Sequence, residues 1–209
     1  MHNVSELLAS LTRTITYPSN RICHASADEV LPILARHFAA EVTRRGRKLD
    51  IYGPAKVIEQ IAGWLTSDNG KPWLVLSGTP GTGKSTAMAA IRNTLREYCV
   101  SAKQFNSSDF PVLFIENVEL TERQILGGDW CRVLLLDDVG VEQTEIKEYG
   151  NIIQPFVKIV EERYKRCLPL VLSTNLNGNE FMQRYGLRTA DRLREMAMTI
   201  KYEGKSYRV

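Results

Sequence analysis

The hydrophobic pattern of the first third of the chain is that of two helices, and it changes after a turn at residues 68–72. Residues 26–45 begin with Ser26, a good N-cap, and end in a basic cluster, as helices often do. Residues 54–65 begin with a proline and repeat apolar side chains at the spacing of one helix face. Beyond the turn come short apolar runs, largely without alternation, at residues 73–77, 112–116, 132–137, 168–173 and 197–202.

These short runs have the character of β-strands in a parallel sheet. The first four resemble strands buried on both faces, and residues 197–202 fit a sheet edge. Strands that alternate with helices predict an α/β fold with helices on both faces of the sheet. Residues 1–50 are expected to form a short helical appendage to one domain, residues 51–209. The helical stretches expected between the strands are residues 84–98, 118–126, 151–167 and 179–196.

The composition is that of an ordinary globular protein. Of 209 residues, 44% are hydrophobic and 24% are charged, which suits one domain with a short extension. The net charge of +3 permits binding to a polyanion but does not require it. Residues 1–20 lack the pattern of a signal peptide, and no segment approaches the roughly 18 apolar residues of a membrane span. We therefore expect a cytoplasmic protein that does not bind a membrane.

The cysteines are spread along the chain without a CxxC pair, and no histidine lies at ligand spacing from them. Each cysteine borders an apolar stretch. Buried free thiols are therefore favoured over metal ligands. The cysteines are Cys23, Cys99, Cys131 and Cys167.

A phosphate-binding loop follows the first expected strand. Residues 78–86 read GTPGTGKST, which fits the pattern GxxxxGK[ST] between a strand and a helix. The glycines let the backbone fold tightly, so that amide N–H groups and the positive end of the next helix face one anion site. Lys84 is expected to reach the β- and γ-phosphates of ATP, and Ser85 to offer its hydroxyl to Mg²⁺. A glycine-rich turn without a ligand is the alternative. The expected nucleotide-binding residues are Gly78, Thr79, Pro80, Gly81, Thr82, Gly83, Lys84, Ser85 and Thr86.

Acidic and polar side chains follow two later strands. The run LLLDD ends in Asp137, expected to hold Mg²⁺ through water, and in Asp138, expected to orient or deprotonate the attacking water. The run LPLVLSTN ends in Asn175, which is placed to hydrogen-bond the γ-phosphate or the lytic water, because ligands bind at the carboxyl ends of parallel strands. The alternatives are helix caps or turn formers at the two aspartates and a strand-to-helix turn at Asn175.

The order and spacing of these motifs resemble the AAA+ ATPases of the DnaC/IstB type, which are bacterial helicase loaders and transposition helper ATPases. The resemblance rests on GTPGTGKST, LLLDDVG, STN, GLRTADRL and the closing GKSYRV, and it covers roughly residues 50–209. It implies a P-loop NTPase core with a five-stranded parallel sheet of order 5-1-4-3-2, helices on both faces and no C-terminal lid domain. It also implies ATP hydrolysis with Mg²⁺. Many relatives carry Glu where this chain has Asp138, and the shorter side chain predicts slow hydrolysis.

The segment GLRTADRL is the one that bears the arginine finger in that family. There, an arginine of this segment reaches the γ-phosphate on a neighbouring subunit, and the match places it at Arg188, with Arg192 as the alternative or a second contact. The planar fork of a guanidinium suits the contact because it binds two phosphate oxygens. A surface helix whose arginines pair with Asp191 and Glu195 is the other interpretation. On a helical wheel both arginines lie opposite an apolar face made by Leu187, Ala190, Leu193 and Ala197.

The resemblance also implies partners. They are other copies of the chain in a head-to-tail oligomer, single-stranded DNA, and a replicative helicase or a transposase. In the family, the region before the acidic motif touches single-stranded DNA; Lys103, Ser107 and Ser108 are candidates here, and a plain surface loop is the alternative. The N-terminal segment is short for a helicase-binding domain.

We therefore expect a lidless AAA+ ATPase that acts on DNA as a helicase loader or accessory in replication initiation, with a transposition helper as the alternative. Two other classes are a small-molecule kinase, which shares the phosphate loop, and a nucleotide-dependent scaffold without hydrolysis, which Asp138 keeps open. Against the kinase, LLLDD and STN end consecutive strands and no arginine-rich lid is evident.

Overall fold

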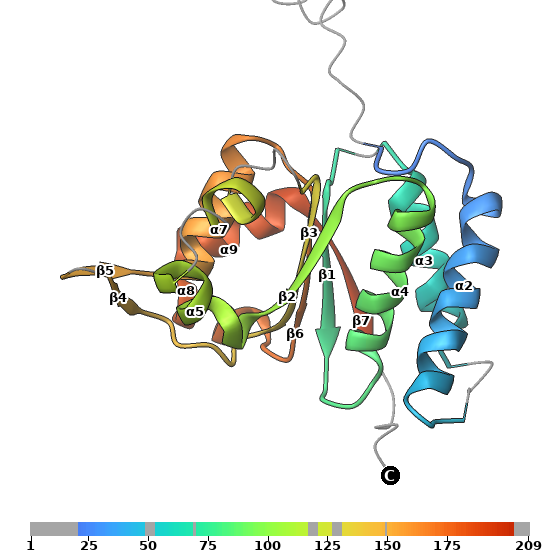
Figure 1. The fold of residues 1–209 in the computed structure, drawn as a ribbon, viewed down its shortest axis with the longest axis horizontal. Coiled ribbons are helices and arrows are strands. Elements are labelled where there is room, and N and C mark those ends of the chain that lie inside the picture. Colours follow the sequence, from blue (N-terminus) through green and yellow to red (C-terminus); the bar gives the residue numbers. More distant parts are fainter. Residues whose placement is uncertain are drawn as a thin grey trace, which may run out of the picture.

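A parallel sheet of five strands forms the centre of the structure (Figure 1). The structure, a computed structural model, describes residues 21–48, 53–68, 70–116, 121–126, 131–148 and 150–202. The strand order β2-β3-β6-β1-β7 is 2-3-4-1-5 when the strands of this sheet are numbered along the chain, which confirms the expected order 5-1-4-3-2. The strands are β1 (Trp73–Gly78), β2 (Ala102–Asn106), β3 (Val133–Val139), β6 (Leu170–Thr174) and β7 (Ala197–Tyr202).

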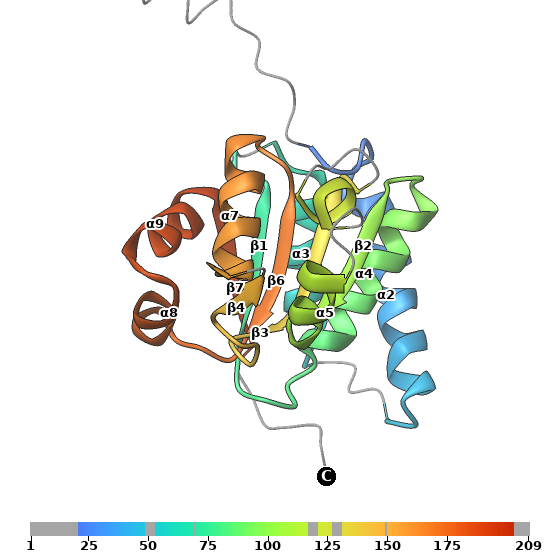
Figure 2. The same ribbon diagram turned by 60° about the vertical axis from the view of Figure 1, so that its left-hand side comes forward.

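Helices cover both faces of the sheet, as Figures 1 and 2 show from two directions. One face carries α2 (Ala27–Arg44), α3 (Ala55–Thr66) and α4 (Lys84–Glu97). The other carries α5 (Phe110–Glu116), α7 (Pro155–Lys165), α8 (Gly178–Tyr185) and α9 (Leu187–Met196). The shorter elements are η1 (Ser107–Asp109), the π-helical η2 (Thr121–Leu126) and a hairpin of β4 (Ile146–Glu148) and β5 (Asn151–Ile153).

One expected strand is wrong, because residues 112–116 lie in α5, and the strand at the edge beside β3 is β2. The apolar run is explained by a helix that buries Phe110, Leu113 and Phe114 at helical spacing. β2 reads AKQFN and has no continuous apolar run, because it pairs only with β3 and is not enclosed as the central strands are. A short amphipathic helix and a buried strand cannot be distinguished by periodicity alone.

The other helix expectations hold with changes at their ends. The expected helix at residues 179–196 is two helices, α8 and α9, separated by Gly186 at a φ of +85°. In the stretch 151–167, the first three residues form β5, and the helix α7 begins after them. Part of the stretch 118–126 lies outside the described residues, and its last six residues form η2.

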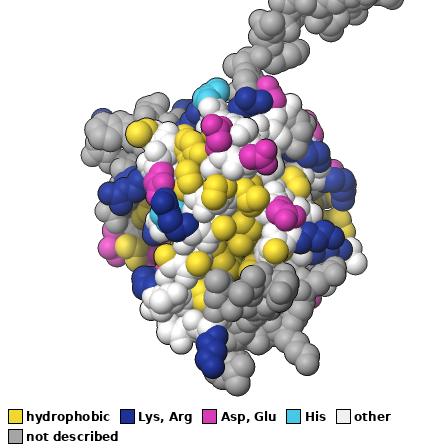
Figure 3. All heavy atoms as spheres, turned by 90° about the vertical axis from the view of Figure 1, so that its right-hand side faces the viewer, with side chains coloured by type: hydrophobic (Ala, Val, Ile, Leu, Met, Phe, Trp, Pro, Cys, Tyr) yellow, Lys and Arg dark blue, Asp and Glu magenta, His cyan; other side chains and the backbone are white. Residues whose placement is uncertain are grey.

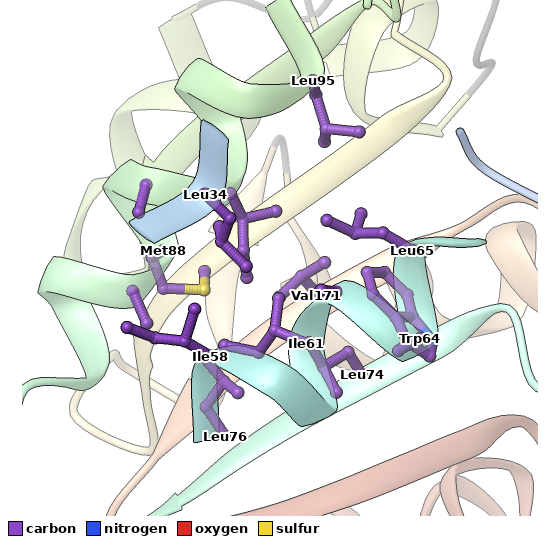
Figure 4. Packing of buried hydrophobic residues seen from close by; sticks show 14 of the residues in the cluster. Leu34, Ile58, Ile61, Trp64, Leu65, Leu74, Leu76, Met88, Leu95 and Val171 are labelled. Carbon is purple, nitrogen blue, oxygen red and sulfur yellow. The ribbon is translucent and has the colours of Figure 1, made fainter. Parts of the chain in front are cut away.

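The helix α2 is fixed to the rest of the molecule by a shared hydrophobic core. Its start is stabilised by a capping box between Ser26 and Glu29. Its buried face carries Leu34, which packs with residues of α3, α4 and the sheet, including Ile61 and Met88 (Figure 4). Figure 3 views the outer side of this layer, where hydrophobic side chains gather between charged ones. The described part of the first fifty residues therefore shares the main core, and the domain boundary near residue 50 stays a prediction.

Two of the cysteines do not have the expected environment. Cys23 and Cys131 are buried free thiols as expected, but Cys99 and Cys167 are free and exposed. Both exposed cysteines follow helix ends with a positive φ, of 55° and 51°. A residue that terminates a helix in this way projects away from the core, whatever apolar residues flank it.

Two further expectations concern membrane-spanning helices and the two ends of the chain. Among the described residues, no helix is both long and apolar enough to cross a membrane. The closing GKSYRV and the first twenty residues lie outside the described part of the chain.

Candidate nucleotide-binding site

The loop between β1 and α4 folds around the amine of Lys84. Lys84 Nζ donates hydrogen bonds to the carbonyl oxygens of Gly78 and Thr79, both at 2.8 Å, and the side chain is buried. Gly83 caps α4 with a φ of +101°, a conformation that few other residues adopt. At Gly78 a Cβ would lie 2.4 Å from the carbonyl oxygen of Tyr202, so β7 closes against the loop only if a glycine is present. The loop is thus held as a compact anion cradle at the start of α4.

The two expected Mg²⁺ ligands lie side by side at the end of this cradle. Ser85 Oγ donates to Asp137 Oδ1 at 3.2 Å, and the Ser173 hydroxyl donates to the same oxygen. Carboxylate and hydroxyl oxygens are ligands that Mg²⁺ accepts, and phosphate oxygens complete its shell in P-loop proteins. No group of three or more His, Cys, Asp or Glu among the described residues is placed to hold a metal ion by itself. The pair Ser85 and Asp137 therefore fits a Mg²⁺ that arrives with nucleotide phosphates.

A backbone irregularity turns Asp138 toward the site. In a regular strand, neighbouring side chains point to opposite faces, so Asp137 and Asp138 would be separated. The pairing of β3 with β6 shifts register between Leu136 and Val139, and Asp138 has a φ of +56°. Its backbone is held there because its N–H donates to Ser173 Oγ at 2.9 Å and its carbonyl accepts from Ser107 Oγ at 2.7 Å. Asp137 therefore lies against Ser85, while Asp138 lines the cavity beside the phosphate loop. Ser107 and Ser173 support them, although the motif gave these serines no such role.

A cavity of about 190 Å³ is lined by six of the nine predicted nucleotide-binding residues. It brings together the phosphate loop, Asp138 and Asn175, as the sequence predicts. Arg45 and Arg47, at the end of α2, also line it and were not among the predicted residues, because nothing in their local sequence shows that α2 ends beside the loop. The other lining residues are Pro80, Gly81, Gly83, Lys84, Ser85, Thr86 and Val141.

A second, larger cavity of about 690 Å³ adjoins the first. It lies between the sheet and the helices α8 and α9, and residues of β1, β7 and both helices line it. Asn175 lines both cavities, whereas Gly78 and Thr79 line the larger one. Thr82 lies in the loop, where its hydroxyl donates to the Thr79 carbonyl at 2.9 Å.

The two candidate arginine fingers do not line the small cavity, and they differ from each other. Arg192 is buried: Nη1 lies 3.0 Å from Glu161 Oε1 of α7, and the guanidinium lies 4.9 Å from the ring centre of Tyr164. Arg188 is exposed and its Nη1 is 3.9 Å from the same Glu161 oxygen. The expected apolar face of the segment is therefore wrong at two positions, since Leu187 is exposed and Arg192 is buried. The cause is α7, which supplies a carboxylate and an aromatic ring to that face.

The ion pairs expected within the segment are also different. Asp191 pairs with Arg194 at 2.6 Å. Glu195 accepts a hydrogen bond from Tyr164 Oη at 2.8 Å, and this bond raises the pKa of Tyr164.

A buried carboxylate links α8 to the loop after β3. Glu142 accepts a hydrogen bond from the backbone N–H of Gly140 at 2.8 Å through Oε2 and one from the Tyr185 hydroxyl through Oε1. Burial is the main cause of the raised pKa of Tyr185, so this phenol stays a donor. The contact joins the segment that follows Asp138 to the helix pair that carries Arg188. Its partners are far apart in sequence, and no motif indicates it.

The candidate DNA contacts lie on the edge strand β2 and in the short helix η1 that follows it. Ser107 is buried and bonded to the Asp138 backbone, which excludes it as a surface contact in this conformation. Ser108 is exposed and its hydroxyl donates to Asn106 at 2.8 Å. Lys103 lies exposed on the edge strand β2.

A phosphate loop after β1, acids at the end of β3 and an asparagine after β6, in a sheet of this order, define the P-loop core of AAA+ proteins. No family model matches the chain. The resemblance to DnaC-type AAA+ ATPases is confirmed by a curated relative, the replicative helicase loader DnaC of Escherichia coli (strain K12), which is 34% identical over 125 residues. The match takes in 57% of this chain and 49% of the relative, so the chain matches about half the length of that protein.

Solved structures share the fold. A crystal structure of the DnaC helicase loader has a TM-score of 0.57 at 17% identity, covering 75% of this chain and 93% of that one. The crystal structure of DnaI also has a TM-score of 0.57, at 23% identity, covering 86% and 93%. A replication initiator DnaA bound to AMPPCP and single-stranded DNA has a TM-score of 0.54 at 17% identity, covering 76% and 49%. These likenesses confirm the α/β AAA+ core that the motifs predict.

Proposed function

We propose that the chain is an ATP-hydrolysing AAA+ protein that loads or assists a replicative helicase on DNA. The observation that carries the proposal is the cavity in which the phosphate loop, Asp138 and Asn175 meet. The β- and γ-phosphates of ATP lie on the loop amides with Lys84. Ser85 and Asp137 would hold a Mg²⁺ ion, which would supply positive charge to neutralise the phosphates.

The hydrolytic step uses the acid and amide across from the loop. Asp138 accepts a proton from the attacking water or orients it, and Asn175 bonds the γ-phosphate or that water. The carboxylate of Asp138 is one methylene shorter than the Glu of many relatives. The reaction is therefore slow within one subunit.

Turnover is completed by a neighbouring subunit. Arg188 lies outside its own phosphate cavity and is exposed, which suits an arginine that reaches the site of the next copy in a head-to-tail assembly. Arg192 is held by Glu161 and Tyr164, so its role is to fix α9.

The assignment to replication rests on the similarity to DnaC, a replicative helicase loader, and the single-stranded DNA contact on the DnaA structure that shares the fold. Single-stranded DNA and a replicative helicase are accordingly the proposed partners. A transposition helper with a transposase as partner is the second candidate, favoured only by the shared family motifs.

The test is a loading reaction. Purified chain is mixed with a hexameric replicative helicase and circular single-stranded DNA coated with single-strand-binding protein, and helicase transfer to DNA and phosphate release are measured with ATP. We expect transfer that requires ATP and is lost in Lys84→Ala. The control is Lys165→Ala, which removes an exposed lysine paired with Glu162 far from the loop. Transfer by Lys84→Ala at the parent rate, or no nucleotide binding by the parent, would overturn the proposal.

A further inference from the structure

The phosphate cavity has a wall that the phosphate loop does not supply. Arg45 and Arg47, at the C-terminal end of α2, line the same cavity of about 190 Å³ as Lys84 and Ser85. In Figure 1 the lower end of α2 lies near the loop that joins β1 to α4. Among the residues that the structure describes, the charged side chains that line the cavity are these two arginines, Lys84 and Asp138. Cations exceed anions there, which suits a polyanionic ligand.

The way α2 ends explains how two arginines reach this position. Gly46 has a φ of +66°, its N–H donates to the Thr43 carbonyl at 2.8 Å, and the N–H of Arg47 donates to the Val42 carbonyl at 3.1 Å. This is the Schellman arrangement, in which a glycine in the left-handed region reverses the chain after the last helical turn. The reversal keeps Arg45 and Arg47 at the same helix end.

The end of α2 is also fixed relative to the loop. Val30, Leu34 and Phe38 are buried in the core shared with α4. A Cβ on Gly83, in the loop itself, would lie 4.0 Å from Phe38 Cζ. The helix therefore presents its C-terminal arginines to the loop from a packed surface.

A buried carboxylate orients one of the arginines. Glu41 Oε1 accepts a hydrogen bond from Arg45 Nε at 2.8 Å, and Glu41 also binds Arg44 through both carboxylate oxygens. The hydrogen bonds from Arg44, followed by the one from Arg45, lower the pKa of Glu41 to about 2, so Glu41 is charged at neutral pH. The bond to Arg45 uses Nε, and a guanidinium has four further N–H groups for a ligand.

We propose that Arg45 and Arg47 bind the polyphosphate of the nucleotide within the same subunit, as a second cationic wall facing the phosphate loop. The inference rests on the proposed ATP binding and adds residues outside the motif to it. It differs from the arginine-finger proposal because both arginines line the cavity of their own subunit. Binding of ATP would then join α2 to the phosphate loop through the ligand.

The test compares three alanine variants at one helix end. Arg45→Ala and Arg47→Ala remove the two lining arginines. Arg44→Ala is the matched control, because Arg44 is 69% exposed, binds the same Glu41 and does not line the cavity. Dissociation constants for ATP and for inorganic tripolyphosphate are measured by calorimetry at one salt concentration, with thermal melting to check the fold.

We expect Arg45→Ala and Arg47→Ala each to weaken binding of both probes about 10-fold or more, as for a charge-assisted hydrogen bond. Arg44→Ala should change neither constant by more than about twofold, since Arg44 does not line the cavity and solvent screens its charge from the ligand. Arg45→Lys should recover part of the loss by keeping the charge. Arg47→Ala changes an exposed side chain and gives an answer even where Arg45→Ala melts early.

Different failures have different meanings. A parent protein that binds ATP, with both variants equal to Arg44→Ala, overturns the arginine wall and leaves the proposed function standing. Loss of ATP affinity without loss of tripolyphosphate affinity also overturns it, because the contact is then to the base or sugar. A parent that binds neither probe overturns the proposed function itself.

Discussion

Arg192 of α9 and Glu161 of α7 form an ion pair, with Nη1 3.0 Å from Oε1. The Arg192 side chain is 10% exposed and lies over Tyr164, whereas Arg188, one turn earlier, is 77% exposed and 3.9 Å from the same carboxylate oxygen. The two arginines of one motif therefore have different surroundings. Arg192 is suited to holding α9 on α7, and Arg188 is suited to a contact outside the subunit.

The first prediction separates these roles by stability. Arg192→Ala should lower the free energy of unfolding by about 1–3 kcal/mol, because it leaves Glu161 without its close partner and removes a ring contact. Arg188→Ala should lower it by no more than about 0.5 kcal/mol, as for an exposed pair. Urea unfolding followed by circular dichroism measures both. Equal losses in the two variants would contradict the assignment of Arg192 as the anchor.

The second prediction concerns the acid at the end of β3. Asp138→Asn should keep the ATP affinity of the parent while slowing hydrolysis by about 10²-fold or more, because an amide cannot accept the proton of the lytic water. The backbone should tolerate the change, since Asn adopts a positive φ more readily than most residues. Phosphate release and ATP affinity are measured in parallel. Asp137→Asn is the contrast: it should weaken Mg²⁺-dependent binding, because Asp137 lies beside Ser85. Parent-like turnover in Asp138→Asn would remove this residue from the catalytic step.

The phosphate loop could be predicted from the sequence because all its parts are adjacent in the chain. The strand, the glycines, Lys84 and the start of α4 occupy one segment, so a local pattern defines them. Asp137, Asp138 and Asn175 could be placed nearby because the carboxyl ends of parallel strands meet at one edge. The order of the sheet came from the family resemblance and was confirmed.

What could not be predicted depends on contacts between distant segments. The burial of Arg192 requires Glu161 and Tyr164, which come from another helix. Arg45 reaches the cavity only because α2 packs on α4. The edge strand β2 was missed because an edge needs no continuous apolar run.

The third prediction concerns acid stability. The pKa of Glu41 is lowered to about 2 in the folded chain, from a usual value of 4.5. A group with a lowered pKa contributes stability above its unfolded pKa, and the contribution is lost as the pH falls through the folded value. Between pH 6 and pH 3 the parent should therefore lose about 2 kcal/mol more unfolding free energy than Glu41→Gln does. Urea unfolding of both proteins at both pH values gives the two losses of unfolding free energy. The contributions of the other carboxylates are common to both proteins and cancel in the comparison. A Glu41→Gln protein with the same acid sensitivity as the parent would contradict it.

The fourth prediction uses the two exposed cysteines that end α4 and α7. Each occupies the position after the helix cap, where the N–H of Cys99 donates to the Arg96 carbonyl and that of Cys167 to the Tyr164 carbonyl. Their φ values of 55° and 51° favour glycine. Cys99→Gly and Cys167→Gly should each raise the free energy of unfolding by about 0.5–1 kcal/mol under reducing conditions. The alanine variants keep the Cβ and serve as controls; a glycine variant no more stable than its alanine counterpart would show that these positions carry no strain.

The last prediction tests whether Arg188 acts on the neighbouring subunit. Arg188→Ala should bind ATP nearly as the parent does, because Arg188 does not line its own phosphate cavity. Turnover should nevertheless fall by ~10³-fold or more if the contact resembles known arginine fingers. Arg36→Ala, which removes another exposed, ion-paired arginine, should hydrolyse ATP at the parent rate.

Mixing two inactive variants then decides between subunits. Lys84→Ala lacks a working phosphate loop but keeps Arg188, and Arg188→Ala has the reverse defect. In a head-to-tail assembly, one interface of the mixture joins an intact loop to an intact arginine, so phosphate release should partly return. A surface helix with internal ion pairs predicts no recovery. If both variants assemble and the mixture stays inactive, Arg188 does not complete a neighbouring site, and binding to DNA phosphates becomes the explanation to test for this arginine-rich helix.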